Sequence, residues 1–277
     1  MAKGTGEPGE RSGTRKTILI TGAASGIGAE TARYFADRDW FVGLYDVNAA
    51  GLETVAGELG PDRCISGTLD VTQREDWGAA VAQFSAATGG RMDVLFNNAG
   101  IARFGWIEEI PQDEADRMID INLKGVVNGV YACLDALKQT PNARIVNTAS
   151  VAGIVGSPRI AVYSATKFAV RGLTEALDVE LKDHGIRATT LMPWFVETPI
   201  LNSGTTGGGN EDMAAELREQ GADVYPVSLA AEQAWAAAHG EEVHYRVGKA
   251  ADQAAFAARF MPKRLRRQLV KNLPERE

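Results

Sequence analysis

Short apolar runs alternate along the chain with longer segments in which apolar residues recur every three or four positions. The short runs are rich in β-branched residues, which predicts buried strands, and the three-to-four spacing predicts helices. The predicted strands are residues 17–21, 40–45, 64–69, 92–97, 144–148, 187–191 and 243–247. The predicted helices are residues 26–37, 49–59, 73–88, 112–138 and 160–183.

This alternation predicts an α/β fold built from strand–helix–strand units, which form a parallel sheet. The strands are apolar along their whole length, as expected when helices cover both faces of the sheet. We find no repeat and no low-complexity linker that divides the chain. We therefore expect a single domain over residues 16–277.

Three segments depart from the alternation. Residues 1–15 are polar and glycine-rich and are predicted to form a flexible tail. Residues 193–240 contain a run of glycines around 204–210, and we interpret this region as a substrate lid, with a passive surface insertion as the alternative. Residues 250–277 are predicted to form a C-terminal helix, and we interpret its basic residues as a solvated face that favours the helix dipole.

Composition and charge narrow the class of protein. Apolar residues make up 45% of the chain and the net charge is −7, so the chain has no global basic field for nucleic acid or an anionic membrane. Charge-free stretches stay shorter than the roughly 20 apolar residues of a membrane-spanning helix. Two cysteines and three histidines suggest no metal site, and Cys64 and Cys133 are expected to be buried thiols. We expect a cytoplasmic protein without a nucleic-acid, membrane or metal partner.

A glycine-rich turn follows the first strand. Its sequence is Gly22-Ala23-Ala24-Ser25-Gly26-Ile27-Gly28, directly before a predicted helix. Such a turn brings backbone N–H groups close to a pyrophosphate at a helix N-terminus. Asp46 ends the second strand, where a carboxylate can bind the ribose hydroxyls of a dinucleotide. A structural turn with a helix N-cap is the weaker alternative.

Four motifs together resemble the short-chain dehydrogenase/reductase family. They are Thr21-Gly22-x3-Gly26-x-Gly28, Asn97-Asn98-Ala99-Gly100, Ser150, and Tyr163-Ser-Ala-Thr-Lys167. The resemblance covers about residues 15–200 and the strand near 243–248. It implies a single-domain doubly wound Rossmann fold, in which helices flank a seven-stranded, mainly parallel sheet.

The resemblance also implies which residues bind the cofactor, with Asp70 and Val71 at the adenine edge and Pro193, Val196 and Thr198 at the nicotinamide. In one departure, Trp194 stands where the family usually has glycine, which narrows the pocket near the nicotinamide. The full set of expected cofactor contacts is Gly22, Ser25, Gly26, Ile27, Gly28, Asp46, Asp70, Val71, Asn98, Ala99, Gly100, Tyr163, Lys167, Pro193, Val196 and Thr198.

Tyr163 and Lys167 are four residues apart in a helical segment, so they share one face. A phenol with a pKa near 10 is a poor base, but a nearby ammonium and an oxidised nicotinamide both favour the phenolate. Tyr163 is therefore predicted to take a proton from an alcohol while hydride leaves. The family implies that Ser150 binds the substrate oxygen and that Asn122 holds a water linking the lysine to solvent. No G-x-S-x-G nucleophile elbow surrounds Ser150, which argues against a hydrolase.

These observations predict an NAD-dependent oxidoreductase that interconverts a secondary alcohol and a ketone. Val47 and Asn48 offer no cation for a 2′-phosphate, which favours NAD over NADP. Apolar residues around the site, namely Ile154, Val155, Trp194 and Phe195, favour a hydrophobic or aromatic substrate. The alternatives are an NADPH-dependent carbonyl reductase and a nucleotide-sensing protein without catalysis.

The two long predicted helices, 112–138 and 160–183, resemble those that pair family members into four-helix bundles. We therefore expect a homodimer or homotetramer. The apolar residues that suggest this contact are Ile119, Val126, Val130, Phe168, Leu173 and Leu177.

Overall fold

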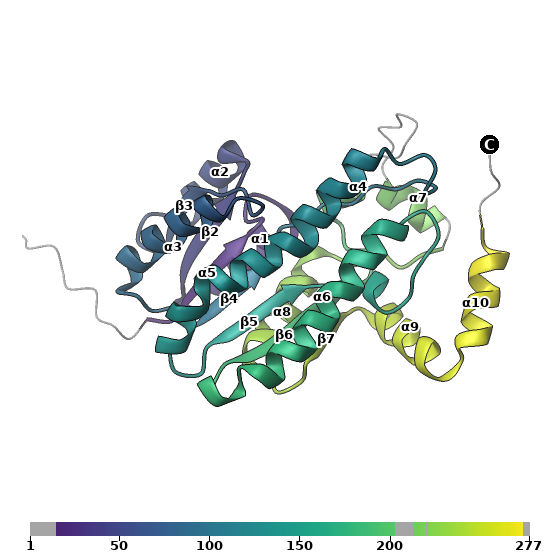
Figure 1. The fold of residues 1–277 in the computed structure, drawn as a ribbon. Helices are drawn as coiled ribbons and strands as arrows, with labels where there is room; N and C mark the ends of the chain where they lie inside the picture. The colour runs from purple at the N-terminus through teal and green to yellow at the C-terminus, as the bar shows by residue number, and fades with distance from the viewer. Residues whose placement is uncertain (1–14, 203–212, 220, 274–277) are drawn as a thin grey trace, which may run out of the picture.

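The computed structural model describes residues 15–202, 213–219 and 221–273. Its centre is a seven-stranded sheet in the order β3-β2-β1-β4-β5-β6-β7, and every neighbouring pair is parallel (Figure 1). The chain order reverses between β1 and β4, which confirms the predicted doubly wound fold. The strands are β1 (Thr17–Thr21), β2 (Phe41–Asp46), β3 (Cys64–Thr68), β4 (Val94–Asn97), β5 (Arg144–Thr148), β6 (Arg187–Pro193) and β7 (His244–Val247).

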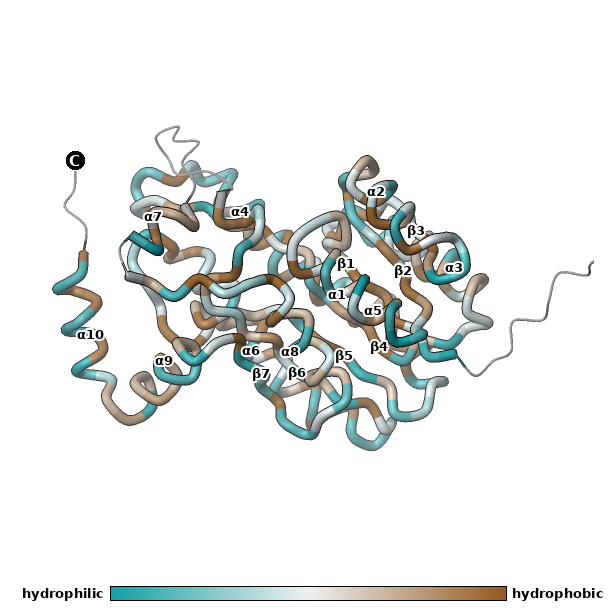
Figure 2. Tube along the Cα trace, turned by 180° about the vertical axis from the view of Figure 1, so that it is seen from behind, coloured by the Kyte–Doolittle hydropathy of each residue, from teal (hydrophilic) through white to brown (hydrophobic). Residues whose placement is uncertain are grey.

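Helices cover both faces of the sheet, which is why the strands are apolar on both sides. One core layer lies under α1 (Gly26–Ala36), α2 (Ala49–Leu59) and α8 (Val227–His239). The other lies under α3 (Arg74–Thr88), α5 (Gly125–Gln139) and α6 (Ala161–Glu180). Figure 2 shows hydrophobic residues concentrated along the central strands between these layers.

Two predicted helices differ from those in the structure. The predicted helix 112–138 is α4 (Gln112–Ile119), a wider π-helical turn at Asp120–Lys124, and α5. The predicted C-terminal helix is two helices, α9 (Lys249–Phe260) and α10 (Pro262–Lys271). The break falls at Met261 because the residue before a proline is disfavoured in helical conformation.

The region expected to form a lid contains a core helix that the sequence analysis did not predict. α8 buries Ala230, Ala231, Ala234, Ala237 and Ala238 against the sheet and α1, so residues 227–239 belong to the scaffold. A lid can therefore involve only the segment before α8, where a short 3₁₀ turn at Pro199–Asn202 and α7 (Met213–Glu219) lie. The glycine run 204–210 and the expected tail, apart from Arg15, lie outside the described residues.

The list of residues predicted to form the subunit contact also needs correction. Val126, Val130 and Leu177 are buried within the protomer, because they pack against its own sheet and neighbouring helices. Ile119 and Phe168 are exposed as the expected contact requires. Tyr131 and Val179 are exposed on the same helices and were not predicted.

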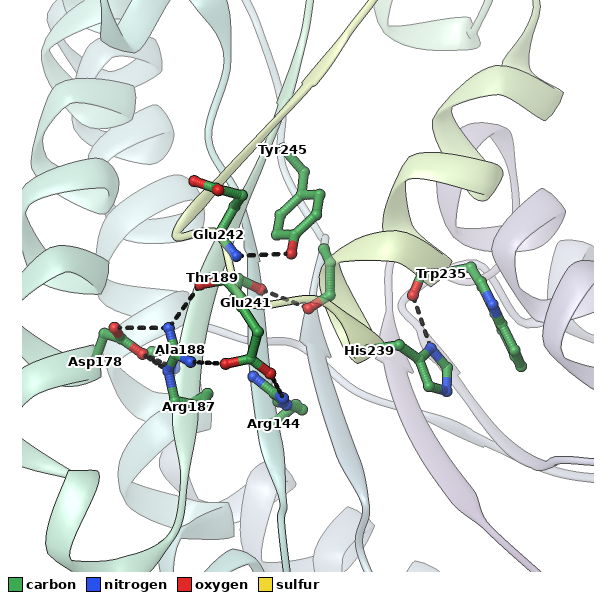
Figure 3. Close-up of polar contacts among 11 residues, drawn as sticks. Arg144, Asp178, Arg187, Ala188, Thr189, Trp235, His239, Glu241, Glu242 and Tyr245 are labelled. Atoms are coloured by element: carbon green, nitrogen blue, oxygen red, sulfur yellow. Dashed lines mark hydrogen bonds and ion pairs between the residues drawn. The ribbon is translucent and has the colours of Figure 1, made fainter.

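The amino-terminal edge of the sheet is held by ion pairs, far from the carboxyl ends of the strands (Figure 3). Arg187 on β6 lies 2.6 Å from Asp178 and 2.7 Å from Glu241, and Arg144 on β5 lies 3.5 Å from Glu241. The amide of Ala188 also donates to Asp178. These contacts tie β6 to α6 and to the segment before β7, so this edge has a structural role.

Cys64 and Cys133 are free and buried, as predicted. The described residues contain no cluster of His, Cys, Asp and Glu side chains arranged to hold a metal ion. Within the same part of the chain, every helix is too short or too polar to span a bilayer.

Candidate active site

A cavity of about 470 Å³ opens at the carboxyl ends of the central strands, beside the point where the strand order reverses. Ligands of doubly wound folds bind at this position. The cavity is lined by all of the predicted cofactor and catalytic residues except Gly28 and Asn122. The prediction of one shared site from separate motifs therefore agrees with the geometry.

The glycine turn forms one end of the cavity. Gly22 and Gly26 have φ values of 68° and 53°, a region that disfavours other residues, and a Cβ on Gly22 would lie 2.9 Å from the Ala99 Cα. Ser25 makes no side-chain capping bond to α1, so the first turn of α1 faces the cavity with free capacity for an anion. Gly28 instead packs beneath the turn, where a Cβ would collide with the Gly22 carbonyl oxygen.

Asp46 connects the end of β2 to this turn. Its carboxylate accepts hydrogen bonds from the amide of Ala24 at 3.1 Å and from the amide of Asn48 at 3.0 Å. Both bonds hold the carboxylate at the cavity wall, next to the exposed side chain of Val47. The position suits ribose hydroxyls, and the charge opposes a 2′-phosphate.

Asparagines at the end of β4 hold the cavity floor together. Asn98 donates to the Thr21 carbonyl at 3.1 Å and accepts from the Thr148 hydroxyl at 3.2 Å, so it joins β1, β4 and β5. Deeper in the core, Asn97 donates to Asn147, which in turn donates to Thr174, both at 2.9 Å. The sequence analysis missed the roles of Thr148, Asn147 and Thr174, because they appear only once the strands are aligned.

Ser150, Tyr163 and Lys167 converge on the cavity from β5 and α6. The Ser150 hydroxyl accepts from the Ala152 amide at 3.1 Å and donates to the Pro193 carbonyl at 3.4 Å. It therefore caps a 3₁₀ turn and also belongs to the site. The Lys167 ammonium donates to the Thr148 carbonyl at 2.9 Å and lies 5.5 Å from the Tyr163 ring centroid.

Burial dominates the pKa values of these two groups. It raises the pKa of Tyr163 to about 12, and the neighbouring Ser150 hydroxyl opposes this only in part. Burial lowers the pKa of Lys167 to about 8. The protein's own groups thus do not lower the pKa of Tyr163, because the effect of burial outweighs that of the neighbouring Ser150. A further positive charge near the phenol is needed to favour the phenolate.

Asn122 lies behind the cavity in the π-helical turn. Its amide oxygen accepts from the Ile101 amide at 2.8 Å, and its nitrogen donates to the Ile101 carbonyl at 2.8 Å and to the Thr166 hydroxyl at 3.3 Å. A Cβ on Gly100 would lie 3.2 Å from the Asn122 oxygen and 3.5 Å from the Lys167 nitrogen. These contacts give Asn122 a role in positioning the loop beside Lys167. They do not themselves test the expected water relay.

Large apolar side chains form the other end of the cavity. Trp194 and Phe195 line it with ring centroids 5.3 Å apart, as predicted, and Phe104 joins them from the loop after β4. Ile154 and Val155 do not line the cavity, and Ile154 packs into the core instead. The indole N–H of Trp194 is buried without a hydrogen-bond partner among the described residues.

The fold, the glycine turn and the Ser-Tyr-Lys group together define a dinucleotide-binding oxidoreductase of the Rossmann type. Residues 16–207 match the short chain dehydrogenase family, and the chain belongs to this family. It is 38% identical to Oxidoreductase UcpA of Salmonella typhimurium over 209 residues. This stretch covers 74% of this chain and 79% of that protein. It is 39% identical to a 3-alpha-(or 20-beta)-hydroxysteroid dehydrogenase of Mycobacterium tuberculosis, over 67% of this chain and 70% of that protein.

Solved structures agree with this assignment. A short chain dehydrogenase/reductase from Burkholderia phymatum, in complex with NAD, is 26% identical with a TM-score of 0.79, over 95% of this chain and 98% of that one. A 3-ketoacyl-(acyl-carrier-protein) reductase from Brucella melitensis, complexed with NADH, is 31% identical with a TM-score of 0.74, over 85% and 98% of the two chains. The chain is therefore an oxidoreductase of the short-chain dehydrogenase/reductase family.

Proposed function

We propose that this chain is an NAD-dependent oxidoreductase that interconverts a secondary alcohol and a ketone, with Tyr163 as the acid/base. The observation that carries the proposal is that Ser150, Tyr163 and Lys167 meet in the same cavity as the glycine turn and Asp46. The cofactor, when bound, supplies the hydride acceptor and a positive ring. The glycine turn fits its pyrophosphate, because Gly22, Ser25 and Gly26 line the cavity and no described side chain caps the first turn of α1.

Each residue of the site has a separate task. Ser150 donates to the substrate oxygen and orients it. The Tyr163 hydroxyl takes the alcohol proton in oxidation and returns it in reduction. Lys167, which is buried and bonded to Thr148, adds a positive charge next to the phenol and holds the nicotinamide ribose. Asn98, Ala99 and Gly100 line the wall between these groups and the glycine turn.

Asp46 supports the preference for NAD. Its carboxylate already accepts two backbone hydrogen bonds and faces the cavity without a neighbouring cation at Val47 or Asn48. A 2′-phosphate placed there would meet a fixed negative charge. Two NAD-type complexes among similar structures support the same choice.

A hydrophobic or aromatic substrate suits the far end of the cavity, where Phe104, Trp194 and Phe195 provide a wide apolar surface. The likeness to a hydroxysteroid dehydrogenase supports this substrate class. The exposed Ile119, Phe168, Tyr131 and Val179 support a homodimer or homotetramer formed by α4, α5 and α6. The two free, buried cysteines are compatible with the reducing cytoplasm.

The test is the absorbance of reduced nicotinamide during turnover with panels of hydrophobic secondary alcohols and ketones, with NAD and NADP in parallel. We expect turnover that is faster with NAD and with apolar substrates. Equal kcat/KM for the two cofactors would reject NAD dependence. Cofactor binding without turnover on any panel member would favour the nucleotide-sensing alternative.

A further inference from the structure

The C-terminal helices form an arm that makes little contact with the rest of the protein. α9 adjoins β7 and the 3₁₀ turn at Val151–Gly153, and among the described elements α9 is the one that packs extensively against α10. No residue of α10 is buried. In Figure 1 the yellow α10 stands away from the body, and this isolation leaves its side chains available for a partner.

The exposed side chains of this arm are not those of an ordinary solvated helix. On α9, Phe256 and Phe260 are 56% and 62% exposed, and their ring centroids lie 4.8 Å apart. Leu265 and Leu269 lie four residues apart on one side of α10 and are half-buried, and Leu273, just after the helix, is 39% exposed. Figure 2 shows hydrophobic and hydrophilic residues alternating along α10. Exposed phenylalanines together with half-buried leucines on one arm mark an interaction surface.

Basic residues occupy the other side of the same helix. At helical spacing, Lys263, Arg264, Arg267 and Lys271 lie opposite the leucine stripe, and α10 contains no acidic residue. Residues 249–273 carry seven Lys or Arg and one Asp, within a chain whose net charge is −7. The overall charge therefore hides a strong segregation, with the positive charge concentrated at the arm.

We propose that this arm binds the surface of an anionic lipid bilayer, with α10 lying in the interface. A basic face opposite leucines, low mean hydropathy and exposed phenylalanines are the features of a helix that inserts its apolar side between headgroups. Lysine and arginine then bind the anionic headgroups. The sequence analysis expected no membrane partner, from the net charge of the chain, and interpreted these basic residues as a solvated face; the proposal departs from both expectations.

The alternative partner is a second copy of this chain. Within the described residues, the body of the protein offers few exposed apolar side chains against which the arm of that copy could pack. The described large apolar side chains exposed outside the arm are Val47, Ile107, Ile119, Tyr131, Phe168 and Val179. Val47 lies at the cofactor cavity, and the last four lie on the helix face already assigned to subunit contact. Ile107 alone is too small to receive a leucine stripe.

Sedimentation of the full chain with vesicles tests the proposal. The protein should bind vesicles that contain phosphatidylglycerol at about 0.1 M salt, and bind pure phosphatidylcholine much more weakly. Arg264→Gln with Arg267→Gln should lower binding about 30-fold, since each cation contributes about 1 kcal/mol near the surface. Leu265→Ser with Leu269→Ser should lower binding without any change in charge.

The matched control is Lys138→Gln with Lys182→Gln, which removes two exposed charges from the body and should leave vesicle binding unchanged. Cofactor binding confirms that each variant is folded, because α10 does not line the cavity. Absence of binding to phosphatidylglycerol vesicles, or equal loss in the control, overturns the proposal. The proposal is also overturned if the wild-type protein does not bind vesicles and the arm variants dissociate an oligomer in sedimentation. In that case the arm binds a second copy of the chain.

Discussion

The two ends of the cavity are formed by different kinds of chemical group. At the nucleotide end, backbone groups and short polar side chains are fixed by hydrogen bonds, as at Asp46 and Asn98. At the substrate end, large rings such as Phe104, Trp194 and Phe195 supply shape, and the rings of Trp194 and Phe195 pack with centroids 5.3 Å apart. The first end depends on conformations that few residues can adopt, whereas many apolar residues could line the second. One end therefore identifies its ligand closely, and the other only its class.

The largest effect is expected where the two ends meet, at Tyr163. Tyr163→Phe keeps the ring and removes the proton-carrying hydroxyl, so kcat should fall about 10²-fold or more. NAD affinity should change little, since the nucleotide end is intact. Single-turnover hydride transfer and calorimetry measure the two quantities.

Tyr131→Phe is the matched control, because Tyr131 is exposed on α5 and away from the cavity. It should leave both quantities unchanged. Near-normal hydride transfer in Tyr163→Phe would mean that another group handles the proton.

Lys167 gives the next largest effect, on stability. Burial lowers its pKa from 10.5 to about 8, so the folded protein binds fewer protons than the unfolded chain between these values. The free energy of unfolding of the wild type should therefore rise between about pH 8 and pH 10.5, as the buried lysine loses its proton. Below pH 8 the lysine is charged in both states, and the full cost of burying the charge lowers stability. Lys167→Met should be more stable at pH 7 by about 1–3 kcal/mol.

Urea unfolding across this pH range measures the difference. The advantage of Lys167→Met should shrink as pH approaches 10.5, the ordinary lysine value. Lys182→Met, at an exposed lysine, should show no such pH dependence. A constant difference between Lys167→Met and the wild type at all pH values would show that packing, not ionisation, sets the effect.

The strands and the nucleotide end of the cavity could be predicted from the sequence, because both place strong local constraints on which residue types can occur. A strand covered on both faces must be apolar throughout, and the turn at Gly22 and Gly26 requires positive φ. The sequence analysis missed α8 because its buried face consists of alanines, which give no pattern of large apolar residues. Alanines serve there because α8 packs closely against α1.

Other features depend on contacts between distant segments. The chain of hydrogen bonds from Asn97 through Asn147 to Thr174 joins two strands and a helix, and no local sequence pattern predicts it. The burial that raises the pKa of the Tyr163 phenol, and the bond of the Lys167 ammonium to Thr148, likewise depend on contacts between distant segments. Residue types and spacing predicted which groups meet, but not which atoms they bond.

Asp46 tests the nucleotide end directly. Asp46→Asn removes the charge and keeps one oxygen acceptor for the turn, so the preference for NAD over NADP should fall about tenfold, or about 1.4 kcal/mol. The measurement is the ratio of kcat/KM for the two cofactors. Glu53→Gln removes an exposed charge from α2 outside the cavity and should leave the ratio unchanged. An unchanged ratio in Asp46→Asn would assign cofactor choice to other residues.

Trp194 tests the substrate end, where we expect the smallest effect. Trp194→Gly places the family's usual residue in the turn after β6 and removes the ring that packs on Phe195. The space gained should raise kcat/KM for bulky ketones relative to small ones by up to about tenfold, the scale of one or two methylene contacts. Trp194→Phe keeps a ring and should shift this ratio less. If both variants keep the wild-type ratio while NAD affinity falls, Trp194 serves the nucleotide end, and the division of the cavity into two ends has to be redrawn at this residue.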